Sequence, residues 1–328
     1  MNLLRHDLYI EPLNAYIDPP FPVDRAIITH AHGDHARAGH KQVLATPDTI
    51  GIMKVRYGGE AAAGSWQELP YNQPLNMGPV RVTMYPAGHI LGSAQVLLET
   101  NEKRIVVSGD YKRRDDQTVE AFQPVQCDIF VTEATFGLPV FQHPHPKEEI
   151  TKLFDSVRNF PDRSHLIAAY GLGKTQRVIS LLRLAGYDAP IYLHGSAWNC
   201  TDYYKRAGVD LGEVRKATGI PKEELKGQIV IAPPSALKEP WSRRMNEPVL
   251  AMASGWMTVK QRVRQRGIEL PLVISDHADW DELTSTIKDT QAGEVWVTHG
   301  RDDGLVHWCG TQGIKGAPLH LQGREDEE

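Results

Sequence analysis

The most informative stretch of the sequence is Ala26-Ile27-Ile28-Thr29-His30-Ala31-His32-Gly33-Asp34-His35. Its first four residues predict a strand, and the glycine that follows predicts a tight turn. A strand end brings alternate side chains to one place, so His30 and His32 can hold one ion. The backbone then folds back, and Asp34 and His35 face a second position. Four potential ligands within six residues predict a metal site, because such groups would be costly to bury without a counter-charge.

Two further candidate ligands follow later strands of the predicted fold. His89 comes after an apolar run over 80–85, and Asp110 comes after another over 104–108. Loops at the carboxyl ends of strands commonly build sites, and an aspartate has two oxygens with which it can bridge two cations. A Gly-His or Gly-Asp pair alone is typical of an ordinary turn. In this order along the chain, after the first stretch, both pairs indicate metal ligands.

These residues together resemble the metal-binding motifs of the metallo-β-lactamase superfamily. Asp18, in Tyr16-Ile17-Asp18-Pro19, is similar to the aspartate of its first motif, which supports the site from behind; the alternative is an ordinary turn aspartate before proline. The resemblance implies an α/β fold, an αβ/βα sandwich with two divalent metals at its rim. Zinc is the first expectation and manganese the alternative. The metal ligands that the resemblance implies in this first part of the chain are His30, His32, Asp34, His35, His89 and Asp110.

Three later segments resemble the β-CASP nuclease branch of that superfamily. Thr132-Glu133-Ala134-Thr135-Phe136-Gly137 is similar to motif A, Ser275-Asp276-His277-Ala278-Asp279 to motif B, and Val297-Thr298-His299-Gly300 to motif C. The resemblance implies that His299 completes the metal ligands. It also implies catalytic roles for Asp34 and Asp110, and for His277 as a proton donor oriented by Glu133. The alternatives are a surface carboxylate for Glu133 and core histidines for the other two.

The order of predicted elements divides the chain into three stretches. Residues 1–137 are rich in short strands, residues 138–268 alternate between strands and helices, and residues 269–328 return to strand, helix and strand. Helices are expected over 144–160 and 174–184. We therefore expect a metallo-β-lactamase domain formed by 1–137 and 269–328, with a compact inserted β-CASP α/β domain over 138–268.

Composition narrows the class of protein. The chain has 328 residues, 41% of them hydrophobic, which excludes a mostly disordered chain. No apolar run approaches the roughly 18 residues of a membrane span, so no membrane partner is expected. Three widely separated cysteines favour a reducing compartment, and we expect a cytoplasmic protein. The net charge of −5 excludes a general nucleic-acid coat, so a polyanion must be held by metals or by a local basic patch.

Candidate substrate contacts lie in the predicted insert. Residues 237–268 carry seven Lys or Arg against two Glu, a balance that suits tracking of a nucleic-acid backbone. The loop Gly171-Leu172-Gly173-Lys174-Thr175 lacks the first glycine of a nucleotide-binding phosphate loop, which argues against NTP hydrolysis. It could still hold a nucleic-acid phosphate at the start of a helix. The predicted substrate-binding residues are Lys174, Ser254, Gly255, Arg262 and Arg264.

The choice between DNA and RNA rests on resemblance. Ala253-Ser254-Gly255-Trp256-Met257 resembles a turn of the DNA-processing branch, whereas His299 and the setting of Glu133 resemble the RNA branch. The mixture and the short length resemble most the bacterial ligase-associated DNA exonucleases. That resemblance implies a 5′-to-3′ exonuclease on single-stranded DNA in repair, with an ATP-dependent DNA ligase and a helicase as functional partners. An RNA-processing β-CASP ribonuclease is the alternative, and a small-molecule metallo-hydrolase is the remaining one.

Overall fold

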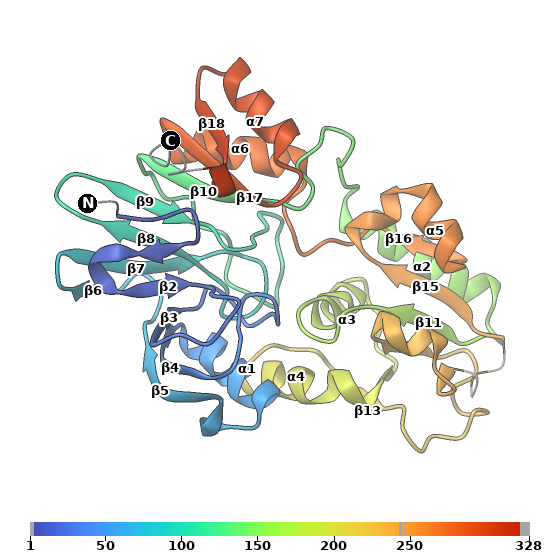
Figure 1. Ribbon diagram of the computed structural model, residues 1–328. Helices are drawn as coiled ribbons and strands as arrows, with labels where there is room; N and C mark the ends of the chain where they lie inside the picture. The colour runs from blue at the N-terminus through green and yellow to red at the C-terminus, as the bar shows by residue number, and fades with distance from the viewer. Residues whose placement is uncertain (1–2, 243–244, 246, 322–328) are drawn as a thin grey trace. The chain divides into compact units, whose positions relative to one another are not determined.

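The chain divides into two compact units in the computed structural model, which describes residues 3–242, 245 and 247–321 (Figure 1). The first unit comprises residues 1–115, 119–142 and 277–328. The second comprises residues 116–118 and 143–276, and is therefore an insertion into the first. The insert expected from the sequence, 138–268, begins and ends a few residues earlier.

The first unit contains two β-sheets. The first sheet has the order β1-β2-β3-β4-β5, and the second has the order β18-β17-β10-β9-β8-β7-β6. The strands of the first sheet are β1 Tyr9–Ile10, β2 Ala15–Ile17, β3 Arg25–Ile27, β4 His40–Ala45 and β5 Ala63–Glu68. Those of the second are β6 Pro74–Met77, β7 Val80–Pro86, β8 Ala94–Glu99, β9 Arg104–Val107, β10 Ile129–Ala134, β17 Glu294–Gly300 and β18 Lys315–Pro318.

The second sheet is covered on both faces, because successive side chains of a strand point to opposite sides. Leu98 and Ile105 pack into an apolar cluster with residues of β1 to β4. Their chain neighbours Leu97 and Val106 point to the opposite side of the sheet. These two side chains pack into another cluster with residues of α6 (Trp280–Thr290) and α7 (Asp302–Thr311). Helix α1 (Pro47–Tyr57) lies beside the first sheet (Figure 1). The first unit is therefore the αβ/βα sandwich that the sequence predicted.

Strand direction gathers four of the predicted functional residues at one edge of the second sheet. β9, β10 and β17 are parallel neighbours, and β7 runs the same way because it is separated from β9 by the antiparallel β8. The loops or strand ends at this edge carry His89, Asp110, Glu133 and His299. The end of β3 is tied to the same edge, since the backbone N–H of Ala94 donates to the carbonyl that precedes His30 at 2.8 Å.

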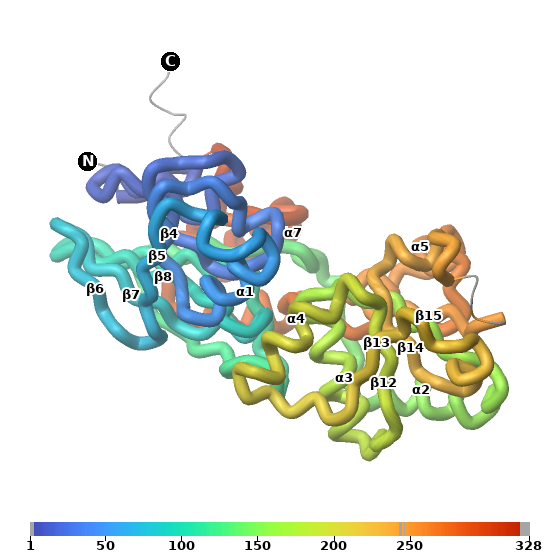
Figure 2. Tube along the Cα trace, turned by 90° about the horizontal axis from the view of Figure 1, so that it is seen from below, coloured from blue at the N-terminus to red at the C-terminus, as the bar shows by residue number. Residues whose placement is uncertain are grey.

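The second unit is built on one six-stranded sheet in which all pairings are parallel, with the order β13-β12-β14-β11-β15-β16. Helix α3 contacts both α2 and α4 on one face of the sheet, and α5 lies on the other face (Figure 2). The strands are β11 His165–Ala168, β12 Ile191–Leu193, β13 Val214–Lys216, β14 Ile229–Ala232, β15 Val249–Ala253 and β16 Leu270–Leu272. The helices are α2 Pro146–Asn159, α3 Lys174–Leu184, α4 Gly195–Arg206 and α5 Lys260–Arg266.

The helices begin where local chemistry favours a helix start. α2 starts with Pro146 at its first position and carries two glutamates in its first turn, where the helix dipole stabilises acidic groups. α6 starts with a capping box, because Asp279 accepts from the Glu282 N–H and the Glu282 side chain accepts from the Asp279 N–H. No helix in the described part of the chain has the length and apolarity that a membrane span needs.

Candidate metal centre

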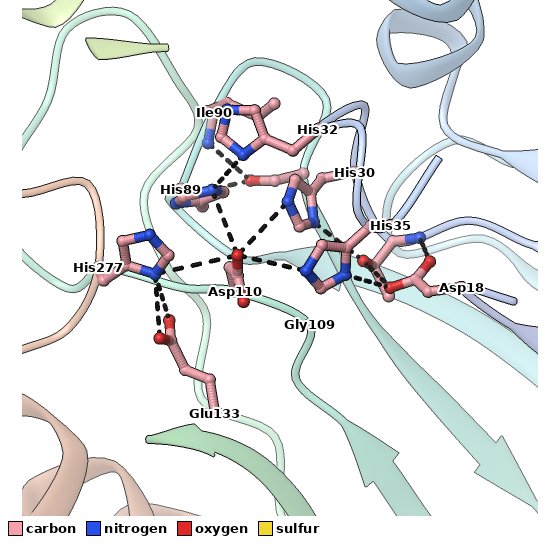
Figure 3. A network of polar contacts seen from close by, with 12 residues as sticks. Asp18, His30, His32, His35, His89, Ile90, Gly109, Asp110, Glu133 and His277 are labelled. Atoms are coloured by element: carbon pink, nitrogen blue, oxygen red, sulfur yellow. Dashed lines mark hydrogen bonds and ion pairs between the residues drawn. The ribbon is translucent and has the colours of Figure 1, made fainter. Parts of the chain in front are cut away.

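The loop after β3 places three histidines around one point of the first unit (Figure 3). The strand ends at Ile27, and the chain then turns back on itself, because the carbonyl of His32 accepts from the backbone N–H of His35 at 3.2 Å. His30 and His35 are buried, and His32 is half-buried. Their rings lie close together, with centroids 4.1 Å apart for His30 and His35 and 5.0 Å for His30 and His32.

Asp110 lies at the centre of this cluster. Its Oδ2 is 3.6 Å from Nε2 of His30, 3.4 Å from Nε2 of His35, 3.8 Å from Nε2 of His89 and 3.9 Å from Nδ1 of His277. Burial by itself would raise the pKa of Asp110, but the neighbouring imidazoles, His35 first, lower this pKa well below its usual range. The cluster therefore holds a fixed negative charge at its centre.

Residues behind the cluster orient the imidazole rings. Asp18 accepts from the backbone N–H of Thr29 at 2.7 Å and from its hydroxyl at 2.5 Å, and its Oδ2 lies 2.8 Å from Nδ1 of His35. Nδ1 of His30 contacts the Thr29 hydroxyl at 3.0 Å. In both histidines Nδ1 is therefore occupied, and Nε2 faces Asp110. Such partners fix the ring and tautomer of metal-binding histidines, so Asp18 is a supporting residue and not a plain turn residue.

The geometry fits a divalent cation. His30, His32, His89 and Asp110 offer donor atoms that all lie within 4.8 Å of one another. Ligands of a tetrahedral ion at about 2.0–2.1 Å are themselves about 3.3 Å apart, close to the separations around Asp110. Burial, and then the charge of His35, lower the pKa of His30 well below its ordinary value, so this imidazole stays neutral. Its buried Nε2 has no hydrogen-bond partner among the described residues. A neutral, orphaned nitrogen is what a metal ion requires.

Glu133 and His277 form a second arrangement beside Asp110. Glu133 is buried at the end of β10, where its Oε1 accepts from the backbone N–H of Tyr111 at 2.8 Å. Nδ1 of His277 lies 3.0 Å and 3.2 Å from the two Glu133 oxygens. The side chain of His277 is 25% exposed, and Figure 3 shows its other ring nitrogen on the side away from Glu133. A carboxylate that fixes one nitrogen of a partly exposed imidazole suits proton transfer at the other.

Two predicted ligands stand at the margin of the cluster. His299 is exposed, and its ring stacks on that of His35 with centroids 4.8 Å apart. Its backbone has φ of +50°, in the left-handed region that most residues avoid. Asp34 is exposed, and its carboxylate does not belong to the His, Asp and Glu groups that the described residues form. Both remain predicted ligands.

Helix α1, which was not among the predicted elements, is hydrogen-bonded to both loops that carry candidate metal ligands. At the start of the helix, the hydroxyls of Thr46 and Thr49 donate to the carbonyl of Gly92 at 2.6 and 2.9 Å. At its end, Arg56 donates to the carbonyl of Ala31, and the hydroxyl of Tyr57 donates to that of Ala36 at 2.5 Å. The available sequence signals were the Thr-Pro pair at the start of α1, since threonine and proline favour the cap and first position, and Gly58 just past its end.

Gly92 permits this contact with the start of α1, and its substitution should be costly. Its φ is +82°, and a Cβ would lie 2.5 Å from the backbone nitrogen of Thr49. We expect Gly92→Ala to lower the free energy of unfolding by about 2–5 kcal/mol, because backbone strain adds to overpacking. Chemical denaturation measures this. The matched control is Gly58→Ala, at φ +86° with nothing within 4 Å, which should cost only about 1–2 kcal/mol. Equal losses in the free energy of unfolding for the two variants would contradict a close packing of Gly92 against the start of α1.

The predicted substrate residues of the second unit have different surroundings. Lys174 is buried, and its Nζ donates to the carbonyl of Ile274 and pairs with Asp276, both at 3.1 Å. The ammonium group of Lys174 is therefore engaged within the second unit, and phosphate binding by Lys174 stays a prediction. Ser254 accepts from the backbone N–H of Trp256 at 3.3 Å.

Some basic residues near the functional loops form contacts with other side chains, and others are exposed to solvent. Arg262 lies over the Trp256 ring at 3.9 Å, and Arg264 is exposed on α5. Arg113 pairs with Asp289 at 2.6 Å, and Arg114 with Asp279 at 2.6 Å, so both hold α6 in place. Among the described basic residues of the predicted substrate region, the arginines of α5 are exposed, as are Lys238 and Lys260. Two further predicted basic residues, Arg243 and Arg244, lie outside the described residues.

Comparison with known proteins agrees with this geometry. Residues 4–162 match the family described as the Beta-lactamase superfamily domain, and these residues contain the cluster from His30 to Asp110. Residues 4–162 of the chain therefore form a β-lactamase superfamily domain. A solved structure titled as a protein of unknown function from Enterococcus faecalis V583 shares this fold, with a TM-score of 0.57 and 14% identity over 84% of this chain and 75% of that one.

Curated relatives of this chain carry names from both DNA and RNA metabolism. The chain is 28% identical to a "Probable DNA ligase" of Opitutus terrae over 93% of this chain and 30% of that protein. It is 28% identical to a "Probable RNase MJ4" of Methanocaldococcus jannaschii over 55% of this chain and 49% of the relative. It is 30% identical to "Cleavage and polyadenylation specificity factor subunit 3" of Dictyostelium discoideum over 35% of this chain and 15% of the relative. The chain thus spans less than half the length of each.

Proposed function

We propose that this chain is a metal-dependent phosphodiesterase that shortens single-stranded DNA from its 5′ end. The observation that carries the proposal is the Glu133–His277 pair next to the Asp110 cluster. Nδ1 of His277 is 3.0 Å from Glu133 and 3.9 Å from Asp110, so a proton donor lies beside the candidate metal ligands. A sugar oxygen is a poor leaving group that needs a proton, whereas many small activated esters do not.

The roles of the residues follow from their places in the site. His30, His32 and His89 would hold one ion and Asp34, His35 and His299 the other, with Asp110 holding both. Two divalent ions, zinc first and manganese as the alternative, would supply an activated water and a clamp on the phosphoryl oxygens. His277 would give a proton from Nε2 to the departing oxygen. Glu133 would keep the ring in the required tautomer and stabilise its charged form.

The preference for DNA is supported by the extent of similarity. The relative named as a DNA ligase is similar over 93% of this chain, whereas the relative named as an RNase is similar over 55% of it and the cleavage and polyadenylation factor subunit over 35%. We propose that unit two is the β-CASP insert, and that the chain works beside an ATP-dependent DNA ligase and a helicase in repair. Three buried cysteines that lie far apart in the sequence suit a reducing compartment such as the cytoplasm.

The deciding experiment compares DNA and RNA strands of one sequence, labelled at either end, with the divalent metal varied. We expect stepwise shortening of DNA from the 5′ end and little action on RNA. The second candidate, an RNA-processing nuclease, is favoured by the relative named as a probable RNase. Faster cleavage of RNA would establish that candidate in place of the first. Hydrolysis of a small lactone or thioester with neither nucleic acid cut would support a small-molecule hydrolase.

A 5′ phosphate should increase the rate. The loop 169–173 and the turn at Ser254 follow β11 and β15, which are adjacent parallel strands with Ala168 opposite Met252. Ligands of open α/β sheets commonly bind outside such strand ends. Backbone N–H groups there, with Arg262 and Arg264 behind them, would recognise a terminal phosphate. Charged hydrogen bonds are worth about 1.5–3 kcal/mol, so we expect at least about tenfold higher kcat/KM than for 5′-hydroxyl DNA.

The control for this prediction uses one DNA sequence labelled at its 3′ end, so that only the 5′ group differs. Equal rates on the two strands would remove the phosphate site. Shortening from the 3′ end would overturn the proposed polarity.

A further inference from the structure

The first turn of helix α3 places two cationic side chains in the interior of the second unit. Lys174 is 4% exposed and Arg177 is 2% exposed, and they lie three positions apart on one face of the helix. Buried charges are costly unless they are paired and hydrogen-bonded. The partners of these two side chains therefore show which part of the unit the helix holds.

Both partners are carboxylates at places where the chain passes between the two units. Lys174 pairs with Asp276 at 3.1 Å, and Arg177 pairs with Asp116 at 3.0 Å, and all four side chains are 5% exposed or less. Asp116 is the first residue of a short passage through the second unit, and Asp276 is the last residue of that unit. The first turn of α3 thus forms ion pairs at two places where the chain passes between the units.

The second crossing leads directly into the candidate acid. His277 follows Asp276 in the chain, and the segment before it is held at three points. Nζ of Lys174 donates to the carbonyl of Ile274 and pairs with Asp276. The backbone N–H of Val273 donates to the buried carboxylate of Glu149 at 2.8 Å. Buried charged side chains, which a substrate does not reach, therefore fix the backbone that leads to His277.

We propose that Lys174 is a positioning residue for His277. By fixing the carbonyl of residue 274 and the carboxylate of Asp276, it sets the direction in which the backbone leaves the second unit. The imidazole of His277 then meets Glu133 with Nδ1 and keeps Nε2 for proton transfer. The inference rests on the proposed function, because it assigns Lys174 to the proton-transfer step of that reaction.

The test compares two substrates of the metal-loaded full-length protein. A DNA strand has a poor leaving oxygen that needs the acid, whereas bis(p-nitrophenyl) phosphate releases a stable phenolate without one. We expect Lys174→Met to lower kcat on DNA by about 10- to 100-fold, with KM and metal content unchanged, because small misplacements of a catalytic group have effects of this size. Its rate on bis(p-nitrophenyl) phosphate should stay within about twofold of the wild type.

The matched control is Lys226→Met in the same unit. This lysine is 60% exposed and pairs with the exposed Asp162 at 3.0 Å, so its loss should change neither rate. Equal loss by Lys174→Met on both substrates would overturn the positioning role, because it would indicate damage to the metal site or the fold. No loss on DNA would overturn it as well. If Lys174→Met fails to fold, Asp276→Asn tests the same contact, since the amide keeps the shape and removes the charge.

A second measurement ties the effect to His277. In a His277→Ala background, Lys174→Met should cause no further loss on DNA, because residues that act through one step are not additive. A full additional loss would contradict the inference. The proposed function is tested separately by the wild type: if it cleaves RNA and not DNA, the same comparison is made with RNA, whose ribose oxygen is an equally poor leaving group.

Discussion

Asp110→Ala should remove nearly all hydrolysis and reduce the amount of bound metal. Oδ2 of Asp110 lies within 3.9 Å of nitrogens from four histidines. No other carboxylate among the described residues is central to all of them. Without it the two candidate ion positions lose their shared anion. Metal ions supply several kcal/mol of transition-state stabilisation, so we expect a fall of about three orders of magnitude or more in kcat/KM.

Metal analysis of the purified protein and a nuclease assay check this prediction together. The control is Asp115→Ala, an exposed aspartate five positions later in the same loop, which should retain activity and metal. Normal turnover with two metals still bound to Asp110→Ala would refute the assignment of Asp110 as the bridge.

His277→Ala and His299→Ala should separate an acid from a ligand. His277 contacts Glu133 and, at 3.9 Å, Asp110, whereas His299 stacks on His35, a predicted ligand. We expect His277→Ala to keep its metals and lose about 10²- to 10⁴-fold in rate, the usual contribution of general acid catalysis. His299→Ala should lose metal, and its activity should fall with occupancy.

The readouts for this pair are metal content and the rate on bis(p-nitrophenyl) phosphate. His277→Ala should act normally on that activated substrate, and His299→Ala should regain part of its activity when excess metal is added. If His277→Ala loses metal and His299→Ala does not, the two roles are exchanged.

The sequence was sufficient for elements with clear periodicity. The helix expected over 174–184 is α3 with those bounds, and the apolar run over 80–85 lies in β7. Helix α1 was not foreseen, because Ile52 and Val55 break the helical spacing of Ile50 and Met53, so no clear apolar face stands out. Its position is set instead by packing and by hydrogen bonds to two distant loops, which no local pattern encodes.

The candidate site was predictable where its residues are close in sequence. His30, His32 and His35 share one loop, so their proximity follows from a strand and a turn. Lys174 was predicted to contact a phosphate because a Gly-Lys-Thr turn before a helix is typical of phosphate binding. Its side chain pairs with Asp276, which lies about a hundred residues later in the chain. Such pairings depend on how strands are ordered in the sheet, and that order cannot be inferred from the local sequence.

Helix α1 supplies no metal ligand, yet it is bonded at its start to Gly92 and at its end to the carbonyls of residues 31 and 36. Those carbonyls belong to the two loops that carry His30, His32 and His89. Any free energy by which an ion orders these loops therefore also opposes local opening of the helix, by linkage. The backbone amides of α1 should exchange with deuterium more slowly as metal binds to the site. The exchange rate of a helix that supplies no ligand would therefore report how much metal is bound.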